Sequence, residues 1–238
     1  MNIPEKLIEL RRIMDRENIA AYIISGTDPH NSEYLPAPWQ QRKWISGFTG
    51  SYGTVVVTKN EAGLWTDTRY FIQAEKELAG SGIKLHKLRV PDAVDYPQWL
   101  VEVLESGTKV GIDGFCMSVS DVRNLKNALS PKNITIQKQI DLLGEMWFDR
   151  PALPVEKIIR LDTKYVGESA GERIGKIREF IRYNHGDAML FSCLDEIAWL
   201  YNIRCNDIAY NPVAISYAIV EKDKAHLFIK LDKISQEI

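Results

Sequence analysis

Residues 51–66, SYGTVVVTKNEAGLWT, carry the pattern that decides the fold. Two runs rich in apolar and β-branched residues, 51–58 and 62–66, are separated by the short polar segment Lys59-Asn60-Glu61. Such runs predict strands, and a short polar connection between them predicts a β-hairpin. The chain therefore builds a sheet around this hairpin, and the flanking elements decide the class of fold.

Helices and strands are expected to alternate on both sides of the hairpin. Before it, Ile3, Leu7, Leu10 and Met14 recur at helical spacing, and residues 19–24 form an apolar run of strand length. After it, the expected elements are helix 70–78, strand 83–88, helix 97–104, strand 110–113, helix 120–129 and strand 134–137. This alternation predicts an α/β domain whose sheet is covered by helices.

The second part of the chain repeats the order of the first. A capping box at residues 169–172 precedes an amphipathic helix, and residues 188–192 follow as a strand. Tyr22 to Ser25 aligns with Met189 to Ser192 at an offset of 167 residues, and the hairpin aligns with residues 216–232 at an offset of 165. Self-similarity of this kind indicates two copies of one structural unit.

The repeat and the prolines between its copies predict the domain organisation. We expect a first domain at residues 1–148, a linker at 149–166 and the start of a second domain at 167–238. Only six residues follow Asp232, whereas the first copy continues well beyond its hairpin. We therefore expect the second domain to be incomplete and the chain to be a fragment; the alternative is a naturally shorter second domain.

Composition narrows the class of protein. The chain has 238 residues with 30 Lys and Arg against 32 Asp and Glu, a formal net charge of −2. This balance argues against a nucleic-acid partner or a membrane surface, and no apolar run is long enough to span a bilayer. The N-terminus lacks the pattern of a signal peptide, and the three cysteines show no disulfide or metal spacing, so the expected location is cytoplasmic.

The usual signatures of catalysis are missing from the sequence. It contains no HExxH, GxSxG, Walker A or GxGxxG motif, and its histidines and cysteines do not lie at metal-ligand spacing. The glycines of residues 47–53 lead into a strand and lack the Lys-Ser/Thr of a phosphate loop, so they are expected to form close turns. The sequence therefore assigns no catalytic residue, no metal ligand and no cofactor to this chain.

Two short segments are candidates for recognition. In residues 65–71, Arg69 offers a bidentate cation to a carboxylate at the end of a strand; the alternative is an internal ion pair with Asp67. Residues 28–39 gather His30 with tyrosine, tryptophan and prolines. This loop is either an exposed recognition surface or a packed Ω-loop.

These segments resemble the N-terminal half of the cytosolic-type Xaa-Pro aminopeptidases, also called aminopeptidase P. The similarity runs in order along nearly the whole chain, and the strings that carry it are residues 22–34, 46–51, 64–71, 149–154, 194–204 and 211–218. The resemblance implies two tandem creatinase N-terminal-like domains, each a ribonuclease H-like α/β domain with a mixed sheet. A C-terminal pita-bread domain with two divalent metals, usually manganese, would follow them.

The family resemblance also implies an activity for the parent protein. Enzymes of this family are metallopeptidases that release an N-terminal residue preceding proline, and the full-length protein is expected to form a homodimer. Their metal ligands belong to the third domain, so this chain alone is expected to be inactive. The alternatives are a stand-alone interaction module without enzyme activity, or the N-terminal region of another pita-bread hydrolase such as a prolidase or creatinase.

The resemblance assigns two residues to substrate access. Arg69 matches the arginine of the family's Trp-Thr-Asp-x-Arg-Tyr motif, which lies towards the substrate mouth. His30 matches the histidine of the family's Asp-x-His-x-Ser-Glu-Tyr loop. Residues 35–39, which continue this loop, are bulkier than the family pattern.

Overall fold

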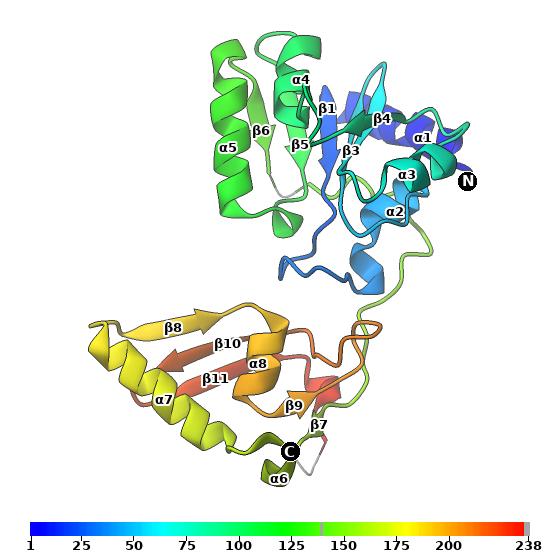
Figure 1. Ribbon diagram of the computed structural model, residues 1–238. Coiled ribbons are helices and arrows are strands. Elements are labelled where there is room, and N and C mark those ends of the chain that lie inside the picture. The colour runs from blue at the N-terminus through cyan, green and yellow to red at the C-terminus, as the bar shows by residue number, and fades with distance from the viewer. Residues whose placement is uncertain (139, 236–238) are drawn as a thin grey trace. The chain divides into compact units, whose positions relative to one another are not determined.

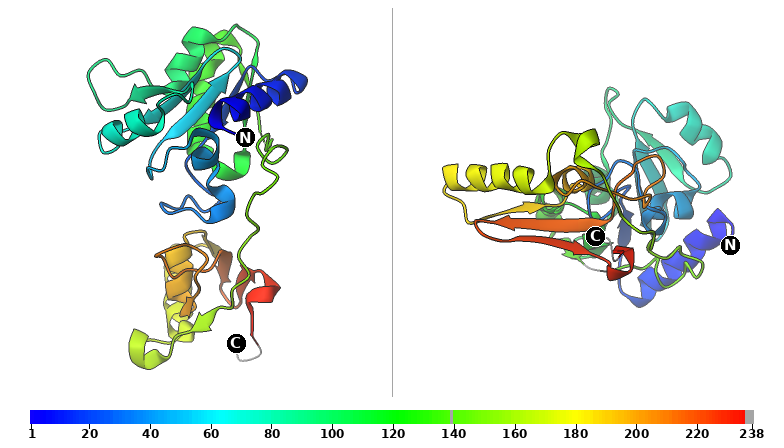
Figure 2. Two further views of the ribbon diagram at one scale, coloured as in Figure 1. Left: turned by 90° about the vertical axis from the view of Figure 1, so that its right-hand side faces the viewer. Right: turned by 90° about the horizontal axis from the view of Figure 1, so that it is seen from below.

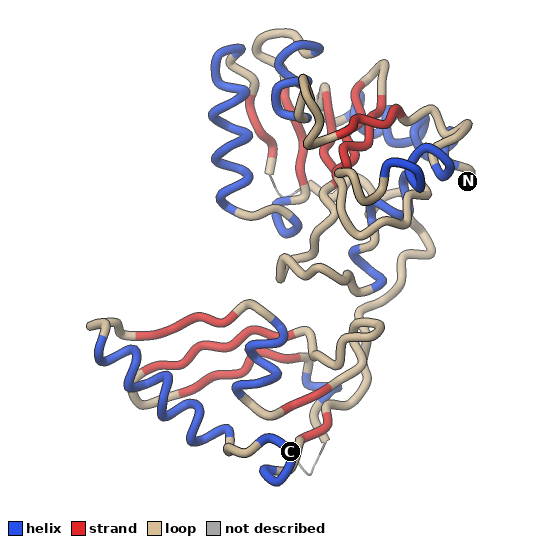
Figure 3. Tube along the Cα trace, viewed as in Figure 1, coloured by secondary structure: helices blue, strands red, loops and turns tan. Residues whose placement is uncertain are grey.

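The computed structural model describes residues 1–138 and 140–235, which form two compact units. Unit 1 comprises residues 1–33 and 38–151, and unit 2 comprises residues 34–37 together with the chain from 152 onward. Figure 1 shows the elements of both units, and Figure 3 shows how much loop connects them within each unit. Each unit has its own sheet and its own buried core.

Unit 1 is built on a six-stranded mixed sheet with the order β4-β3-β2-β1-β5-β6. Its strands are β1 (Ala21–Ile24), β2 (Thr54–Thr58), β3 (Ala62–Thr66), β4 (Lys84–Lys87), β5 (Lys109–Ile112) and β6 (Thr135–Gln137). Strand β2 is antiparallel to β1 and to β3, and all other neighbours are parallel. Five strands therefore point the same way, and their carboxyl ends meet at one edge of the sheet.

Helices cover both faces of this sheet (Figure 1). One face carries α1 (Ile3–Arg16), α2 (Gln41–Ser46) and α3 (Phe71–Glu77), and the other carries α4 (Tyr96–Val103) and α5 (Val119–Leu129). Successive residues of a strand point to opposite faces, and here both sets are buried. The valine-rich run of β2 is continuous because neither of its faces meets water.

Unit 2 has a smaller antiparallel sheet with the order β11-β10-β8. Its strands are β8 (Ala188–Phe191), β10 (Ser216–Glu221) and β11 (Ala225–Ile229), and a separate pair is formed by β7 (Ile159–Arg160) and β9 (Ile203–Arg204). Its helices are α6 (Thr163–Val166), α7 (Ala170–Tyr183) and α8 (Leu194–Leu200). Four short 3₁₀ turns complete the described elements: Ala37–Trp39, Gly114–Cys116, Ser130–Lys132 and Leu231–Lys233.

One face of the unit 2 sheet is left open by the described residues. Helices α7 and α8 pack on the face that carries Phe191, Ala218 and Val220, and Figure 2 shows α7 on one side of the strands. The opposite face carries Leu190, which is 66% exposed, and Phe228, which is 54% exposed. Apolar residues thus remain on a surface that no helix of unit 2 covers.

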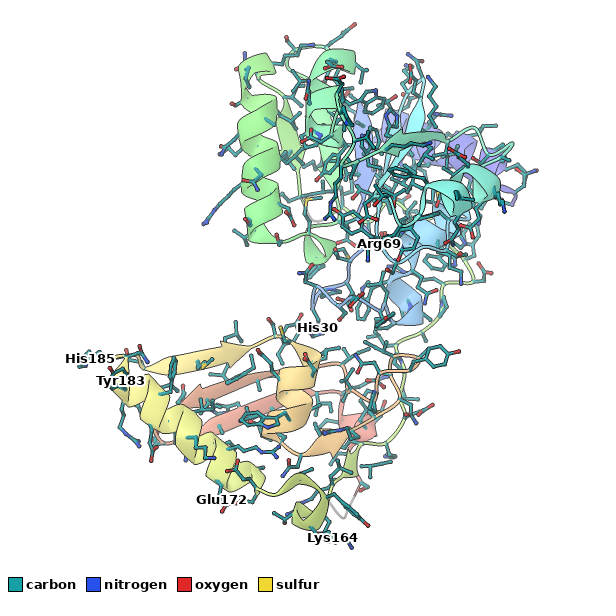
Figure 4. All side chains as sticks on the ribbon, viewed as in Figure 1. His30, Arg69, Lys164, Glu172, Tyr183 and His185 are labelled. Atoms are coloured by element: carbon teal, nitrogen blue, oxygen red, sulfur yellow. The ribbon has the colours of Figure 1, made fainter. Side chains whose placement is uncertain are left out.

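The predicted repeat is confirmed at its helix and first strand. Helices α1 and α7 each contain 14 residues and each begin with a complete capping box, Asn2 with Glu5 and Ser169 with Glu172. Both helices are followed by a left-handed residue, Asn18 and His185, each with φ 54°. Figure 4 labels Glu172 and His185 near the two ends of α7. The offset between all these pairs is 167 residues, as predicted.

The predicted offset of 165 for the hairpin is wrong by two residues. The turn of the first hairpin is closed by a bond from Thr58 N to the Glu61 carbonyl, and that of the second by a bond from Glu221 N to the Lys224 carbonyl, each 2.8 Å long. These pairs are related by an offset of 163, so Trp65 corresponds to Phe228. The sequence alignment matched similar side chains, whereas the register is set by the turns.

The alternating elements expected from the sequence are found in unit 1, with small differences at their ends. The sequence did not predict α2, α6, β7 or β9. Two of these, β7 and α6, lie inside the predicted linker 149–166, and Ile158 just before β7 is 4% exposed. Ile158 packs with Cys205 and Ala214, so the second half of the predicted linker contributes to the core of unit 2.

Candidate functional site

A cleft of about 310 Å³ lies at the edge of unit 1 where the carboxyl ends of the parallel strands meet. It is bordered by the residue that follows β1, by the turn that enters β2, by Trp65 near the end of β3 and by the segments after β4 and β5. In open α/β sheets ligands bind outside the carboxyl ends of the strands. Its lining includes Ser25, Thr27, Tyr52, Trp65, Leu88, Tyr96, Met117 and Asp121.

The glycine-rich turn at one side of the cleft is held by a buried arginine. The Arg42 guanidinium donates to the carbonyls of Gly50, Ser51 and Gly53, with the last bond 3.0 Å long. Burial lowers the pKa of Arg42 to about 10. These glycines present carbonyl groups to a cation, which fits the predicted close turns and does not fit a cradle of amides around phosphate.

Asp67 and Arg69 form a bidentate ion pair just after β3. Arg69 Nε lies 3.0 Å from Asp67 Oδ1, and Arg69 Nη2 lies 3.0 Å from Asp67 Oδ2. The side-chain bond from Arg69 is the main cause that lowers the pKa of Asp67, and the same bond raises the pKa of Arg69. The internal ion pair expected as the alternative is therefore present, yet the Arg69 side chain is still 55% exposed whereas Asp67 is 1% exposed.

Two arginines face the ring of Tyr52. The guanidinium carbon of Arg69 lies 5.7 Å from the ring centroid, and that of Arg89 lies 5.9 Å from it. Arg89 Nη1 is also 3.8 Å from Asp67 Oδ2. The sequence did not indicate a role for Arg89 or Tyr52, because Arg89 reaches Asp67 only through the parallel pairing of β3 with β4, which brings the residues after both strands to one edge.

His30 lies on a different loop of unit 1 from Arg69 (Figure 4). His30 is only 6% exposed, and its backbone N–H donates a hydrogen bond of 3.0 Å to Asp28 Oδ1. The same carboxylate oxygen accepts a bond from Ser32 N at 2.8 Å, and Asp28 is itself 2% exposed. The start of the loop is therefore packed, as in the Ω-loop alternative, and His30 belongs to its interior.

The cysteines and the possible metal ligands of the described residues were compared with the requirements of a reactive thiol and of a metal site. Cys116 and Cys205 are buried and Cys193 is exposed, and burial is the main cause that raises the pKa of Cys116. Among residues 1–138 and 140–235, no three His, Cys, Asp or Glu side chains are placed to hold a metal ion. In the same described ranges, no helix has the length and apolar character needed to cross a membrane.

Comparisons with known proteins match both units of the chain. Residues 6–143 match the creatinase/prolidase N-terminal domain, and residues 149–238 match a second creatinase/prolidase N-terminal domain. Aminopeptidase P2 of Arabidopsis thaliana is 39% identical over 241 residues, and Xaa-Pro aminopeptidase 1 of Dictyostelium discoideum is 38% identical over 244 residues. Each alignment covers 99% of this chain.

A solved structure matches the chain along its whole length. It is the X-prolyl aminopeptidase of Caenorhabditis elegans, described as a cytosolic enzyme with a di-nuclear active site. The TM-score is 0.94 at 36% sequence identity, and the match covers 100% of this chain and 40% of that one. The chain likewise spans 34% of the Arabidopsis protein and 39% of the Dictyostelium protein.

Proposed function

The chain belongs to the creatinase/prolidase N-terminal domain family, and from this premise we propose that it serves an Xaa-Pro aminopeptidase as the region that shapes access to the active site. The observation that carries the proposal is the end-to-end match to the X-prolyl aminopeptidase of Caenorhabditis elegans, with a TM-score of 0.94. The corresponding substrates are peptides with proline in the second position. The proposed location is the cytosol, as described for that enzyme.

The hydrolytic chemistry is proposed to belong to a part of the protein outside this sequence. Xaa-Pro aminopeptidases of this kind would use two divalent metals, which we propose to be manganese, to activate water and polarise the peptide carbonyl. The described residues offer no group of ligands for such a pair. Isolated, the 238-residue chain is expected to leave Xaa-Pro peptides intact in excess manganese, and a full-length protein is expected to cleave them.

We propose that the open face of the unit 2 sheet packs against the remainder of the full-length protein, including its pita-bread catalytic domain. The face carries Leu190 and Phe228, and their counterparts in unit 1, Ile23 and Trp65, are buried under α4 and α5. An apolar patch of this kind marks a contact surface. Contacts between two copies of the full-length protein, which would make it a homodimer, belong to the same proposal.

Arg69 is proposed to contact the peptide substrate at the mouth of the active site. Its guanidinium is held in orientation by Asp67 and stays half exposed, which leaves hydrogen-bond donors for a peptide carbonyl or carboxylate. His30 is proposed to act on access indirectly, because it is buried within the loop that it shapes.

The test of Arg69 uses the full-length enzyme. Arg69→Gln is expected to lower kcat/KM about tenfold, chiefly through a higher KM, because a charged hydrogen bond to the substrate is lost at a partly solvated site. Arg123→Gln is the matched control, since it removes an exposed arginine from α5 of the same unit. Equal kinetics for wild type and Arg69→Gln, with both folded by circular dichroism, would assign the arginine to the ion pair alone.

A further inference from the structure

The lining of the unit 1 cleft includes hydrogen-bond acceptors. The Ser25 hydroxyl and the Thr27 hydroxyl both donate to the Cys116 carbonyl, the latter at 2.5 Å. Thr27 Oγ1 also lies 3.2 Å from Ser25 Oγ, so with both protons engaged within the protein the two oxygens offer a ligand lone pairs only. The Asp121 carboxylate also lines the cleft, and one of its oxygens accepts a bond of 2.6 Å from Ser118 Oγ.

Much of the remaining lining is aromatic and apolar. Trp65 is fixed by a bond of 3.0 Å from its Nε1 to the Val94 carbonyl, and its ring centroid lies 6.3 Å from that of Tyr96. Tyr52, Leu88 and Met117 complete this surface. The pKa of the Tyr96 hydroxyl is raised chiefly by burial, and the carboxylates of Asp121 and Asp95 and the hydroxyl of Tyr52 raise it further, which places these groups in one neighbourhood.

Two arginines, Arg69 and Arg89, lie beside the ring of Tyr52, which lines the cleft, although neither arginine is itself part of the lining. Arg69 donates two side-chain hydrogen bonds to Asp67, and the negative charge of Glu33 contributes to raising the pKa of Arg69. Arg89 reaches Asp67 only at 3.8 Å, and in the described part of the chain no hydrogen bond is made by its guanidinium. Arg89 is therefore the cation that remains available beside the ring of Tyr52.

The backbone of Arg89 supports a functional placement. Its φ is 59°, in the left-handed region that side chains other than Asn, Asp and His seldom adopt. Strain of this kind persists only where the surrounding structure imposes it, and it gathers at binding sites. Here it directs the guanidinium over Tyr52, which lines the cleft.

We propose that this cleft binds a short zwitterionic peptide of dipeptide size, with its ammonium group against Ser25, Thr27 and Asp121 and its carboxylate against Arg89. An ammonium group is a donor without acceptors, and the first three residues offer acceptors. A carboxylate is the natural partner of a guanidinium, and the aromatic wall suits an apolar side chain between them. The volume of about 310 Å³ is at the small end of ligand pockets, which limits the peptide to about two residues.

The test measures binding of three probes to the 238-residue chain by isothermal titration calorimetry. Glycyl-leucine carries both charges, N-acetyl-glycyl-leucine lacks the ammonium group, and glycyl-leucinamide lacks the carboxylate. Glycyl-leucine is expected to bind with a Kd of about 1 mM, as befits a small ligand in an open cleft, and each blocked probe at least fivefold more weakly. L-leucine, a smaller zwitterion that lacks the peptide group, is expected to bind more weakly than glycyl-leucine.

Two variants assign the ends of the ligand. Asp121→Asn is expected to weaken glycyl-leucine about fivefold and to leave N-acetyl-glycyl-leucine unchanged, and Arg89→Gln is expected to weaken glycyl-leucine and leave glycyl-leucinamide unchanged. The matched controls are Glu105→Gln and Arg123→Gln, which remove one exposed charge each elsewhere on unit 1. No saturable binding of glycyl-leucine, equal binding of all three probes, or binding that survives both variants would each overturn the proposal.

The site does not depend on the proposed peptidase function. The probes are tested on a chain that contains no catalytic domain, so binding can be present when the aminopeptidase assignment fails, and absent when it holds. Conversely, loss of activity in Arg69→Gln without any binding of glycyl-leucine would leave the substrate proposal standing and remove this one.

Discussion

The two units use the same helix, strand and hairpin but bury them differently. In unit 1 the cross-strand pair Ile23 and Val56 is 2% and 0% exposed, because α4 and α5 lie over it. The corresponding pair in unit 2 is Leu190 and Ile219, and Leu190 is 66% exposed. The difference comes from what lies over the strands, since the strands themselves pair in the same register.

The side chains of unit 2 are nevertheless those of a covered face. Leu190, Tyr217, Ile219 and Phe228 occupy most of the outward positions of its three strands, and the remaining ones carry Ala188, Glu221 and His226. A sheet with one wet face normally alternates apolar and polar residues. The sequence of unit 2 is thus suited to a sheet covered on both sides, although only one side is covered by the described residues.

The largest effect is expected from placing a charge on equivalent strand positions. Val56→Asp puts an unpaired carboxylate into the core beneath α4 and α5 and should destabilise unit 1 by about 4–5 kcal/mol. Ile219→Asp puts the same group on the open face and should cost about 1 kcal/mol, mainly from strand propensity. Denaturant titrations followed by hydrogen–deuterium exchange give the stability of each unit separately.

Fluorescence provides a simpler check of the same comparison. Five of the six tryptophans lie in unit 1, and Trp199 is the one in unit 2, so the emission change on unfolding reports mainly on unit 1. The fluorescence midpoint should fall sharply in Val56→Asp, and the small effect of Ile219→Asp is read from the hydrogen–deuterium exchange of unit 2. Equal losses of stability in the two variants would mean that the face of unit 2 is buried, and the contrast between the units would be broken.

The second effect concerns an ion pair that is buried in unit 2, in contrast to the half-exposed Asp67–Arg69 pair of unit 1. Lys233 Nζ donates to Asp207 Oδ1, and the two side chains are 2% and 0% exposed. Asp207 Oδ2 also accepts a bond of 2.7 Å from Ile215 N. Asp207→Ala leaves a buried ammonium group without its partner and should destabilise unit 2 by about 3–5 kcal/mol, measured by denaturant titration with circular dichroism.

A double variant separates the stranded charge from lost packing. Asp207→Ala with Lys233→Met removes both charges and should recover about 2 kcal/mol of the loss, because no buried ion remains unpaired. The bond to Ile215 N is still missing, so recovery is expected to be partial. If the single and double variants are equally unstable, the carboxylate acts through that backbone bond and not through Lys233.

The elements of the fold could be predicted because their signals are local. Helical spacing, the capping box at residues 169–172 and the valine-rich hairpin depend on neighbours a few residues apart, and the structure contains each of these features. The hairpin offset was predicted wrongly because it depends on which residues close a turn, Thr58 with Glu61 and Glu221 with Lys224. Helix α2 was missed because, at six residues, it is too short to show a period.

The candidate site was only partly predictable for the same reason. The ion pair of Asp67 with Arg69 spans two residues, so the motif itself suggested it. Arg89 joins them only because β4 pairs with β3 in parallel and because its own backbone is left-handed. Neither condition leaves a mark in the sequence near Arg89, so the second cation and the cleft beside Tyr52 needed the structure.

The smallest effect is expected where the units are most alike, at their two capping boxes. Asn2→Ala removes the bond of 2.9 Å from Glu5 N to Asn2 Oδ1, and Ser169→Ala removes the bond of 3.2 Å from Glu172 N to Ser169 Oγ. Each change should cost about 1 kcal/mol, because one backbone donor of the first helical turn loses its acceptor. Hydrogen–deuterium exchange should show faster opening at the start of the affected helix alone.

The matched changes Asn2→Ser and Ser169→Asn keep a cap and should restore stability. A loss in Ser169→Ala much larger than in Asn2→Ala would mean that unit 2, with one sheet face open, depends on α7 more than unit 1 depends on α1.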